Sequence, residues 1–195
     1  MKRIGRITRK TSETDIAVEI TLDGSGSGSI ETTIPFFNHM LASMMRHSLT
    51  DIRIEACGDT DVDDHHLVED VGICLGEALK EALGTKEGIG RYGCAFVPMD
   101  ESLSHVSIDL SGRPYLVYNV NLDNKKIGDF ELLQFREFFK AFSDHGGITL
   151  HMNVIYGRNP HHIAESLFKA FARALGEAVS TDARIAGVMS TKGNL

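Results

Sequence analysis

The sequence has no tryptophan, few aromatic residues and only three cysteines among its 195 residues. So low an aromatic content predicts a core packed mainly by aliphatic side chains. Cys57, Cys74 and Cys94 are odd in number and irregularly spaced, which is typical of reduced thiols in a cytoplasmic protein. A disulfide framework is therefore not expected.

An excess of positive charge is also missing, as is any long apolar run. The formal net charge is −7, so the chain lacks the basic face that nucleic-acid binding requires. No segment approaches the roughly 20 apolar residues of a membrane span. The basic start, residues 2–6, has no apolar stretch after it and does not resemble a signal peptide. These absences predict a soluble cytoplasmic protein without nucleic-acid or membrane partners.

What the sequence does contain is one short motif, written twice: His-His-x-x-Glu at His65–Glu69 and again at His161–Glu165. On a helix, a histidine and a glutamate one turn apart share a face, and such pairs recur as metal-binding units. Adjacent histidines point about 100° apart on a helix. A single ion is therefore not expected to take both, and each doublet should serve two ions, or one ion and another group.

Hydrophobic periodicity predicts the same order of elements in both halves of the chain. In the first half we expect strands at 3–9, 15–22, 29–34 and 52–56, with helices at 35–47 and 65–83. In the second half we expect strands near 91–98, 102–110, 114–121 and 147–156, with helices near 130–143 and 160–179. The predicted fold class is α+β: internally duplicated β-β-β-α-β-α halves, about 1–86 and 87–195, each a two-layer unit of sheet and helices in one domain.

Matched positions support an internal duplication. His39 lies 26 residues before His65, and Glu137 lies 24 residues before His161, each in the first helix of its half. The helices that begin at the doublets also share the sequence Leu-Gly-Glu-Ala, at residues 75–78 and 175–178. Two such units would pack through their helices or their sheet edges.

The repeated polar residues give eight candidate metal ligands, enough for two sites of about four ligands each. They are His39, His65, His66, Glu69, Glu137, His161, His162 and Glu165. Imidazole and carboxylate ligands suit Mn²⁺, Fe²⁺ or Zn²⁺, and the lack of cysteine in the set argues against a structural zinc. An octahedral ion such as Mn²⁺ would keep positions open for a substrate.

Other polar residues receive weaker predictions. Asp63 or Asp64 is expected to cap the helix that follows and to orient its histidines, with Asp59 and Asp61 solvated. His47 and His145 fall near helix ends, where a structural role is favoured. His105 and His151 are left without a role.

A possible anion site comes from residues scattered along the second half. Arg91, Arg113, Ser190 and Lys192 could together hold a phosphate through charge-assisted hydrogen bonds. Composition alone favours the alternative, in which the arginines are surface charges and the C-terminal tail is frayed.

The chain resembles the imidazoleglycerol-phosphate dehydratase family over essentially its whole length, through several longer sequence motifs that occur in the same order. They are Phe37–Leu41, Asp63–Asp70, Pro98–Glu101, Asp109–Pro114, His161–Glu165 with Phe168–Leu175, and Ser190–Gly193. The resemblance implies dehydration of D-erythro-imidazole glycerol phosphate to imidazole acetol phosphate in L-histidine biosynthesis. It also implies two Mn²⁺ per active site and an assembly of 24 subunits built from trimers, with active sites between subunits.

The resemblance assigns roles to particular residues. Glu13 matches the position that contacts substrate and acts as base, and His66, Glu69 and Glu165 complete the implied catalytic group. The four anion candidates match residues that grip the substrate, chiefly its phosphate. Two positions depart from the family: Asn38 stands where aspartate is frequent, and the position of Glu137 is histidine in some members.

Two rival functions fit the same motifs. A binuclear phosphohydrolase would want more bridging carboxylates than this set supplies. A non-catalytic metal-binding assembly would have no need of Arg91, Arg113 or Lys192.

Overall fold

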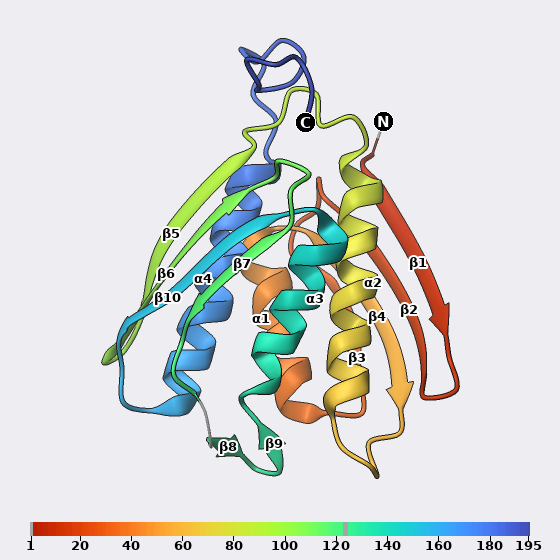
Figure 1. The fold of residues 1–195 in the computed structure, drawn as a ribbon, viewed down its shortest axis with the longest axis vertical. Coiled ribbons are helices and arrows are strands. Elements are labelled where there is room, and N and C mark those ends of the chain that lie inside the picture. Colours follow the sequence, from red (N-terminus) through yellow and green to blue (C-terminus); the bar gives the residue numbers. More distant parts are fainter. Residues whose placement is uncertain (1, 123–124) are drawn as a thin grey trace.

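The computed structural model describes residues 2–122 and 125–195. Each half of the chain contributes one four-stranded sheet and two helices, and the four helices lie between the two sheets (Figure 1). In the first half the elements are β1 (Ile4–Lys10), β2 (Thr14–Thr21), β3 (Gly28–Glu31), α1 (Pro35–Ser48), β4 (Asp51–Gly58) and α2 (His65–Leu83). In the second half they are β5 (Tyr92–Met99), β6 (Ser102–Asp109), β7 (Tyr115–Asn119), β8 (Lys126–Ile127), β9 (Phe130–Glu131), α3 (Gln134–Gly146), β10 (Thr149–Tyr156) and α4 (Pro160–Val179).

The two sheets have the same topology. The strand order is β1-β2-β4-β3 in one and β5-β6-β10-β7 in the other, and in each the last strand pairs parallel with its neighbour. The predicted α+β class and the repeated order of elements are confirmed, with most boundaries within a residue or two.

Three boundaries were predicted wrongly, by three residues or more. The strand expected to reach residue 34 ends at Glu31, because the Asn38 side chain accepts hydrogen bonds from the backbone N and the hydroxyl of Thr32 and turns the chain into α1. The helix expected near residues 130–143 begins at Gln134 and ends at Gly146. Phe130 and Glu131 instead pair with β8 as a small hairpin, which the period of the apolar residues did not reveal.

Helices from different halves pack against each other. α2 lies on β1 and β2 of its own sheet and contacts α3, whereas α4 lies on β5 and β6 and contacts α1. The two halves therefore meet through their helices, one of the two arrangements expected. Among the described helices, none is long and apolar enough to cross a membrane.

The core is aliphatic only in part. Ile16, Val18 and Ile20 point inward from β2, as their alternation predicted. The second half departs from the expected aliphatic packing, because its phenylalanines are concentrated in two facing helices rather than spread along the chain. The buried rings in α3 and α4 are Phe135, Phe138, Phe139, Phe142, Phe168 and Phe171.

Candidate functional site

Both histidine doublets lie in the first turn of their helices, at the same end of the helical layer (Figure 1). Asp63 Oδ1 accepts a hydrogen bond from the backbone N of His65 at 2.8 Å, and Asn159 Oδ1 accepts one from that of His161 at 2.9 Å. These side chains satisfy free amides of the first turn. Of the two predicted caps, Asp63 therefore makes the bond and Asp64 does not.

The two rings of each doublet diverge. The planes of His65 and His66 are 89° apart, and those of His161 and His162 are 77° apart. Each ring accordingly has different neighbours, as the helical geometry predicted.

One ring of the second doublet joins a cluster that draws on both halves. His39 comes from α1, while His161 and Glu165 come from α4, which packs on α1. Glu165 Oε2 lies 3.4 Å from His161 Nε2 and 3.9 Å from His39 Nε2. Among the described residues, this is the one group of histidine, cysteine or acidic side chains that brings three potential ligand atoms within 4.8 Å of one another.

Lys169, one turn beyond Glu165, has no counterpart in the sequence predictions. Its Nζ lies 2.8 Å from Glu165 Oε1, which leaves Oε2 directed to the two imidazoles. Burial opposes ionisation of Glu165, but Lys169, His39 and His161 outweigh it and hold the pKa of the carboxyl below its usual value. Glu165 is therefore an ionised acceptor at neutral pH.

The corresponding residues of the other doublet are less converged. His65 Nε2 lies 3.8 Å from Glu69 Oε2, one turn along α2. Glu137 lies in the first turn of α3, the helix that packs on α2, and its carboxylate contacts Arg136 at 3.3 Å. Packing of α1 on α4 thus brings His39 to the second doublet, and packing of α3 on α2 places Glu137 on the helix beside the first.

The second histidine of each doublet contacts carboxylates from loops. His66 Nδ1 lies 3.1 Å from Asp59 Oδ2 and 3.9 Å from Glu13 Oε2. The hydrogen bond with Asp59 is the main reason why the pKa of His66 is raised. Asp59 was expected to be solvated; it instead holds an imidazole, because the loop before α2 folds back over the helix start.

His162 has an analogous partner that the sequence predictions missed. Glu101, in the turn between β5 and β6, places Oε2 2.7 Å from His162 Nδ1, and its Oε1 accepts hydrogen bonds from the backbone N of Arg158 and Asn159. The bond with Glu101 raises the pKa of His162 and lowers that of Glu101 itself. The available signal was position: Glu13 occupies the matching turn, between β1 and β2.

The anion candidates gather at the other end of the helices. The Arg91 side chain is largely buried, forms two hydrogen bonds with Asp109 at 2.7 and 3.2 Å and donates a third to the carbonyl of Met189. Arg113 Nη2 lies 3.6 Å from Asp109 Oδ2. We call Arg91, Arg113 and the tail from Met189 the arginine group; Ser190 lines the same hollow as Arg91, and its hydroxyl accepts a hydrogen bond from the backbone N of Lys192.

This arginine group is far from the histidine cluster of the same chain. The backbone N of Arg91 donates to the carbonyl of Ala178 at the C-terminal end of α4, whereas His162 is in the first turn of that helix. At a rise of about 1.5 Å per residue the two ends are about 25 Å apart. One small molecule cannot reach both within one chain.

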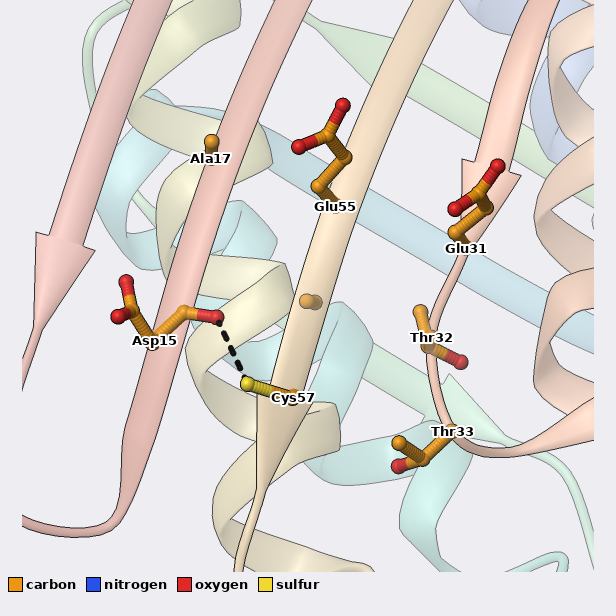
Figure 2. A pocket seen from close by; sticks show the side chains of 8 residues that line it. Asp15, Ala17, Glu31, Thr32, Thr33, Glu55 and Cys57 are labelled. Carbon is orange, nitrogen blue, oxygen red and sulfur yellow. Dashed lines mark hydrogen bonds between the residues drawn. The ribbon is translucent and has the colours of Figure 1, made fainter.

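A separate hollow lies on the outer face of the first sheet, across β2, β4 and β3 (Figure 2). Acidic side chains of Asp15, Glu31 and Glu55 line it, together with Cys57 and neighbouring threonines. None of the predicted site residues is among its lining. The predicted site residues therefore lie at the ends of the helices and not in this hollow.

The fold and these residues indicate the class of protein: an α+β enzyme with two similar halves, in which imidazoles and carboxylates lie close together where helices of opposite halves pack. Comparison with known proteins narrows that class. The family model described as imidazoleglycerol-phosphate dehydratase matches residues 32–175.

Relatives and solved structures agree with this match. Imidazoleglycerol-phosphate dehydratase of Syntrophus aciditrophicus (strain SB) is 60% identical over 194 residues, covering 99% of this chain and 98% of that protein. The one of Trichlorobacter lovleyi is 56% identical, with both chains fully covered. The crystal structure of the Staphylococcus aureus enzyme superposes with a TM-score of 0.83 at 40% identity, covering 92% of this chain and 99% of that one. The crystal structure of the Pyrococcus furiosus enzyme in complex with (S)-C348 superposes with a TM-score of 0.83 at 38% identity, covering 97% of this chain and 100% of that one.

The chain belongs to the imidazoleglycerol-phosphate dehydratase family and is an enzyme of the hydro-lyase class that serves histidine biosynthesis.

Proposed function

We propose that the protein catalyses the metal-dependent dehydration of D-erythro-imidazole glycerol phosphate to imidazole acetol phosphate. The observation that carries the metal dependence is the cluster of His39, His161 and Glu165. Two imidazole nitrogens and an ionised carboxylate oxygen, held together by packed helices, are a donor set that divalent transition ions accept.

The ligands fit Mn²⁺, which we propose as the cofactor, two ions per active site. His39, His161 and Glu165 would hold one ion; His65, Glu69 and Glu137, related to them by the repeat, would hold another. His66 and His162 contact carboxylates through Nδ1, and we propose Nε2 of each as a further ligand. In His162 that atom lies 3.8 Å from Oδ2 of the mostly exposed Asp100. When bound, the ions supply Lewis acidity to the imidazole ring of the substrate, so that the ring withdraws electrons from the side chain that reacts.

Glu13 is the proposed base. Its carboxylate is half-exposed on the turn between β1 and β2 and lies beside His66, so it can meet a substrate held at this end of the helices. There it takes the carbon-bound proton as the adjacent C–O bond breaks, and a carbon–carbon double bond forms between the two carbons. The departing hydroxyl takes up a proton from solvent to become water, and the carboxyl returns its proton to solvent afterwards. The enol so produced becomes the ketone by moving a proton.

The arginine group supplies the phosphate contacts. Arg91 is fixed by Asp109 and by the carbonyl of Met189, while the Arg113 side chain is mostly exposed. Arg113 and the backbone of the tail can therefore receive a phosphate without rearranging the sheet, and we propose Ser190 and Lys192 as further contacts.

Because the arginine group and the histidine cluster are about 25 Å apart in one chain, an active site that needs both must combine two copies. The described surface supports association: Tyr92, Phe96, Tyr115, Ile155 and Tyr156, all on the second sheet, are at least half exposed. Exposed apolar patches of this kind mark protein interfaces. We propose the family's assembly of 24 subunits, built from trimers.

The proposed function is tested by stripping metal from the purified protein, adding back Mn²⁺ and following the substrate by mass spectrometry. We expect a product lighter by one water, formed only after Mn²⁺ is restored, with no free phosphate. Phosphate release in place of dehydration would indicate a phosphohydrolase. Bound Mn²⁺ without any turnover would indicate a metal-binding assembly, and either result would overturn the proposal.

A further inference from the structure

We infer that Asp70 is a positioning residue, which anchors the turn carrying Glu13 to helix α2. The inference rests on the proposed function, in which Glu13 is the base, and it adds a residue that fixes where that base stands.

Asp70 is a carboxylate buried on α2, directly after Glu69. A buried charge is costly unless both of its oxygens are bonded. Here Oδ2 accepts a hydrogen bond from the Thr14 hydroxyl at 2.5 Å, and Oδ1 accepts one from Nε of Arg9 at 3.0 Å. Arg9 belongs to β1 and Thr14 to β2, so one helical carboxylate binds both strands of the hairpin.

From Thr14 the contacts continue into the turn itself. The hydroxyls of Thr14 and Thr11 are 3.1 Å apart, and the Thr11 hydroxyl accepts hydrogen bonds from the backbone N of Glu13 and of Thr14. On the other side, the Glu13 carbonyl accepts from the backbone N of Asp59. The backbone before the Glu13 side chain is therefore tied through Thr11 and Thr14 to Asp70 of α2, and the backbone after it is tied to Asp59, directly after β4.

The same helix carries the site. Asp70 is one turn after His66, on the same face of α2, and Glu13 Oε2 lies 3.9 Å from His66 Nδ1. Through Asp70, the helix that carries the imidazole therefore also helps to set its distance from the base. Because a misplacement of about 1 Å can slow a reaction about a hundredfold, this anchor should act on the chemical step. The hydrogen bonds of this anchor include none of the proposed metal ligands and no residue of the arginine group.

A merely structural role for Asp70 would give a different result, so the test separates stability from positioning. Substituting Asp70 itself risks unfolding, because the buried Thr14 hydroxyl would lose its acceptor and Arg9 its ion-pair partner. Thr14→Val removes only the hydroxyl that binds Asp70 and keeps the shape of the side chain, whereas Thr14→Ser keeps the hydroxyl. Thr21→Val makes the same change at the other end of β2, where the residue is also buried.

The assembled, Mn²⁺-loaded enzyme is compared across these three variants. We expect Thr14→Val to speed hydrogen exchange in the peptide spanning residues 11–15 by about tenfold and to lower kcat by about tenfold or more. The KM for substrate and the metal content per chain should stay at wild-type values. Thr14→Ser and Thr21→Val should retain the wild-type exchange rate and kcat.

Three outcomes would overturn the inference: unchanged exchange in Thr14→Val, faster exchange with unchanged kcat, or a loss of kcat that Thr21→Val shares equally. Loss of bound metal in Thr14→Val would overturn it as well, because the effect would then be on the ligands. Failure of the wild-type protein to dehydrate the substrate would remove the proposed function instead, and the exchange rates would still decide whether the hydroxyl anchors the turn.

Discussion

Glu13 and Glu101 occupy matching hairpin turns, yet their surroundings differ. The Glu101 carboxylate is 2.7 Å from His162 and is bonded to two backbone amides, so its hydrogen-bonding capacity is used within the protein. The Glu13 carboxylate is half-exposed, and its 3.9 Å distance from His66 is longer than a hydrogen bond. The first therefore orients an imidazole, and the second remains available to a substrate.

Glu13→Gln should abolish turnover because the amide cannot accept the carbon-bound proton. The side chain keeps its shape, so bound Mn²⁺ per chain, measured by elemental analysis, should equal that of the unmodified protein. Glu19→Gln, on the neighbouring strand β2, is the matched control and should be fully active. Retained turnover in Glu13→Gln would rule out Glu13 as the base.

The pair Glu101–His162 should give stability a bell-shaped dependence on pH. The raised pKa of His162 contributes stability below its ordinary value of 6.5 and loses it as pH rises; the lowered pKa of Glu101 contributes above 4.5 and loses it as pH falls. Glu101→Gln should therefore lower the melting temperature of metal-free protein most near pH 5.5, and less near pH 9. An equal difference at both pH values would show that the ion pair contributes nothing.

At the scale of elements, glycines allow each sheet to approach its helix. A Cβ on Gly5 of β1 would lie 1.9 Å from the carbonyl oxygen of Ala78, and a Cβ on Gly93 of β5 would lie 1.8 Å from that of Ala174. The Glu81 and Glu177 carboxylates accept hydrogen bonds from the backbone N of the next strand residues, Arg6 and Cys94. In both halves, strand and helix are therefore joined in the same way, by a glycine packed against a helix carbonyl and a glutamate bonded to the next residue of the strand.

These contacts correct one detail of the predicted repeat. Ala78 and Ala174 are 96 residues apart, as are Glu81 and Glu177, and as are the two doublets. The shared word Leu-Gly-Glu-Ala, by contrast, recurs after 100 residues, one helical turn out of register. The repeated motif supported the duplication, but its residues do not occupy equivalent positions in the two helices. The equivalent positions are shown by the contacts between strand and helix, which cannot be predicted from a single sequence.

Gly93→Ala should strongly destabilise the protein, by about 3 kcal/mol, because the new Cβ meets backbone that cannot move without separating β5 from α4. Gly90→Ala, whose Cβ would be 3.1 Å from its nearest neighbour, is the control and should cost much less. Denaturant unfolding of the two variants measures the difference. Equal stability of both would show that the close approach is not needed.

Sequence reasoning succeeded where local patterns decide the outcome. The period of the apolar residues placed α2 at its observed bounds, and both predicted histidine doublets lie in the first turn of a helix. The partners of these residues could not be predicted in the same way. The contact of His39 with His161 depends on α1 packing against α4 of the other half, and Lys169 and Asp59 gain meaning only from contacts made in the folded chain.

Over the whole molecule, two kinds of polar residue lie at opposite ends of the helices. Imidazoles and carboxylates lie where α2 and α4 begin, and the arginine group lies where α4 ends, beside the C-terminal tail (Figure 1). On the proposed function, each end alone would bind only part of a phosphorylated imidazole. We therefore expect every active site to take its histidine cluster from one copy and its arginine group from another.

Mixed assemblies test this directly. His161→Ala removes a cluster ligand, and Arg113→Ala removes a phosphate contact; each variant alone should turn over poorly at limiting substrate. Co-assembled in equal amounts, they should regain activity up to about a quarter of the wild-type value, because some sites then draw both intact parts from different copies. Mixing His161→Ala with Glu165→Ala, which damage the same cluster, should give no gain. If His161→Ala and Arg113→Ala together were no more active than either alone, the site would not be shared between copies as proposed.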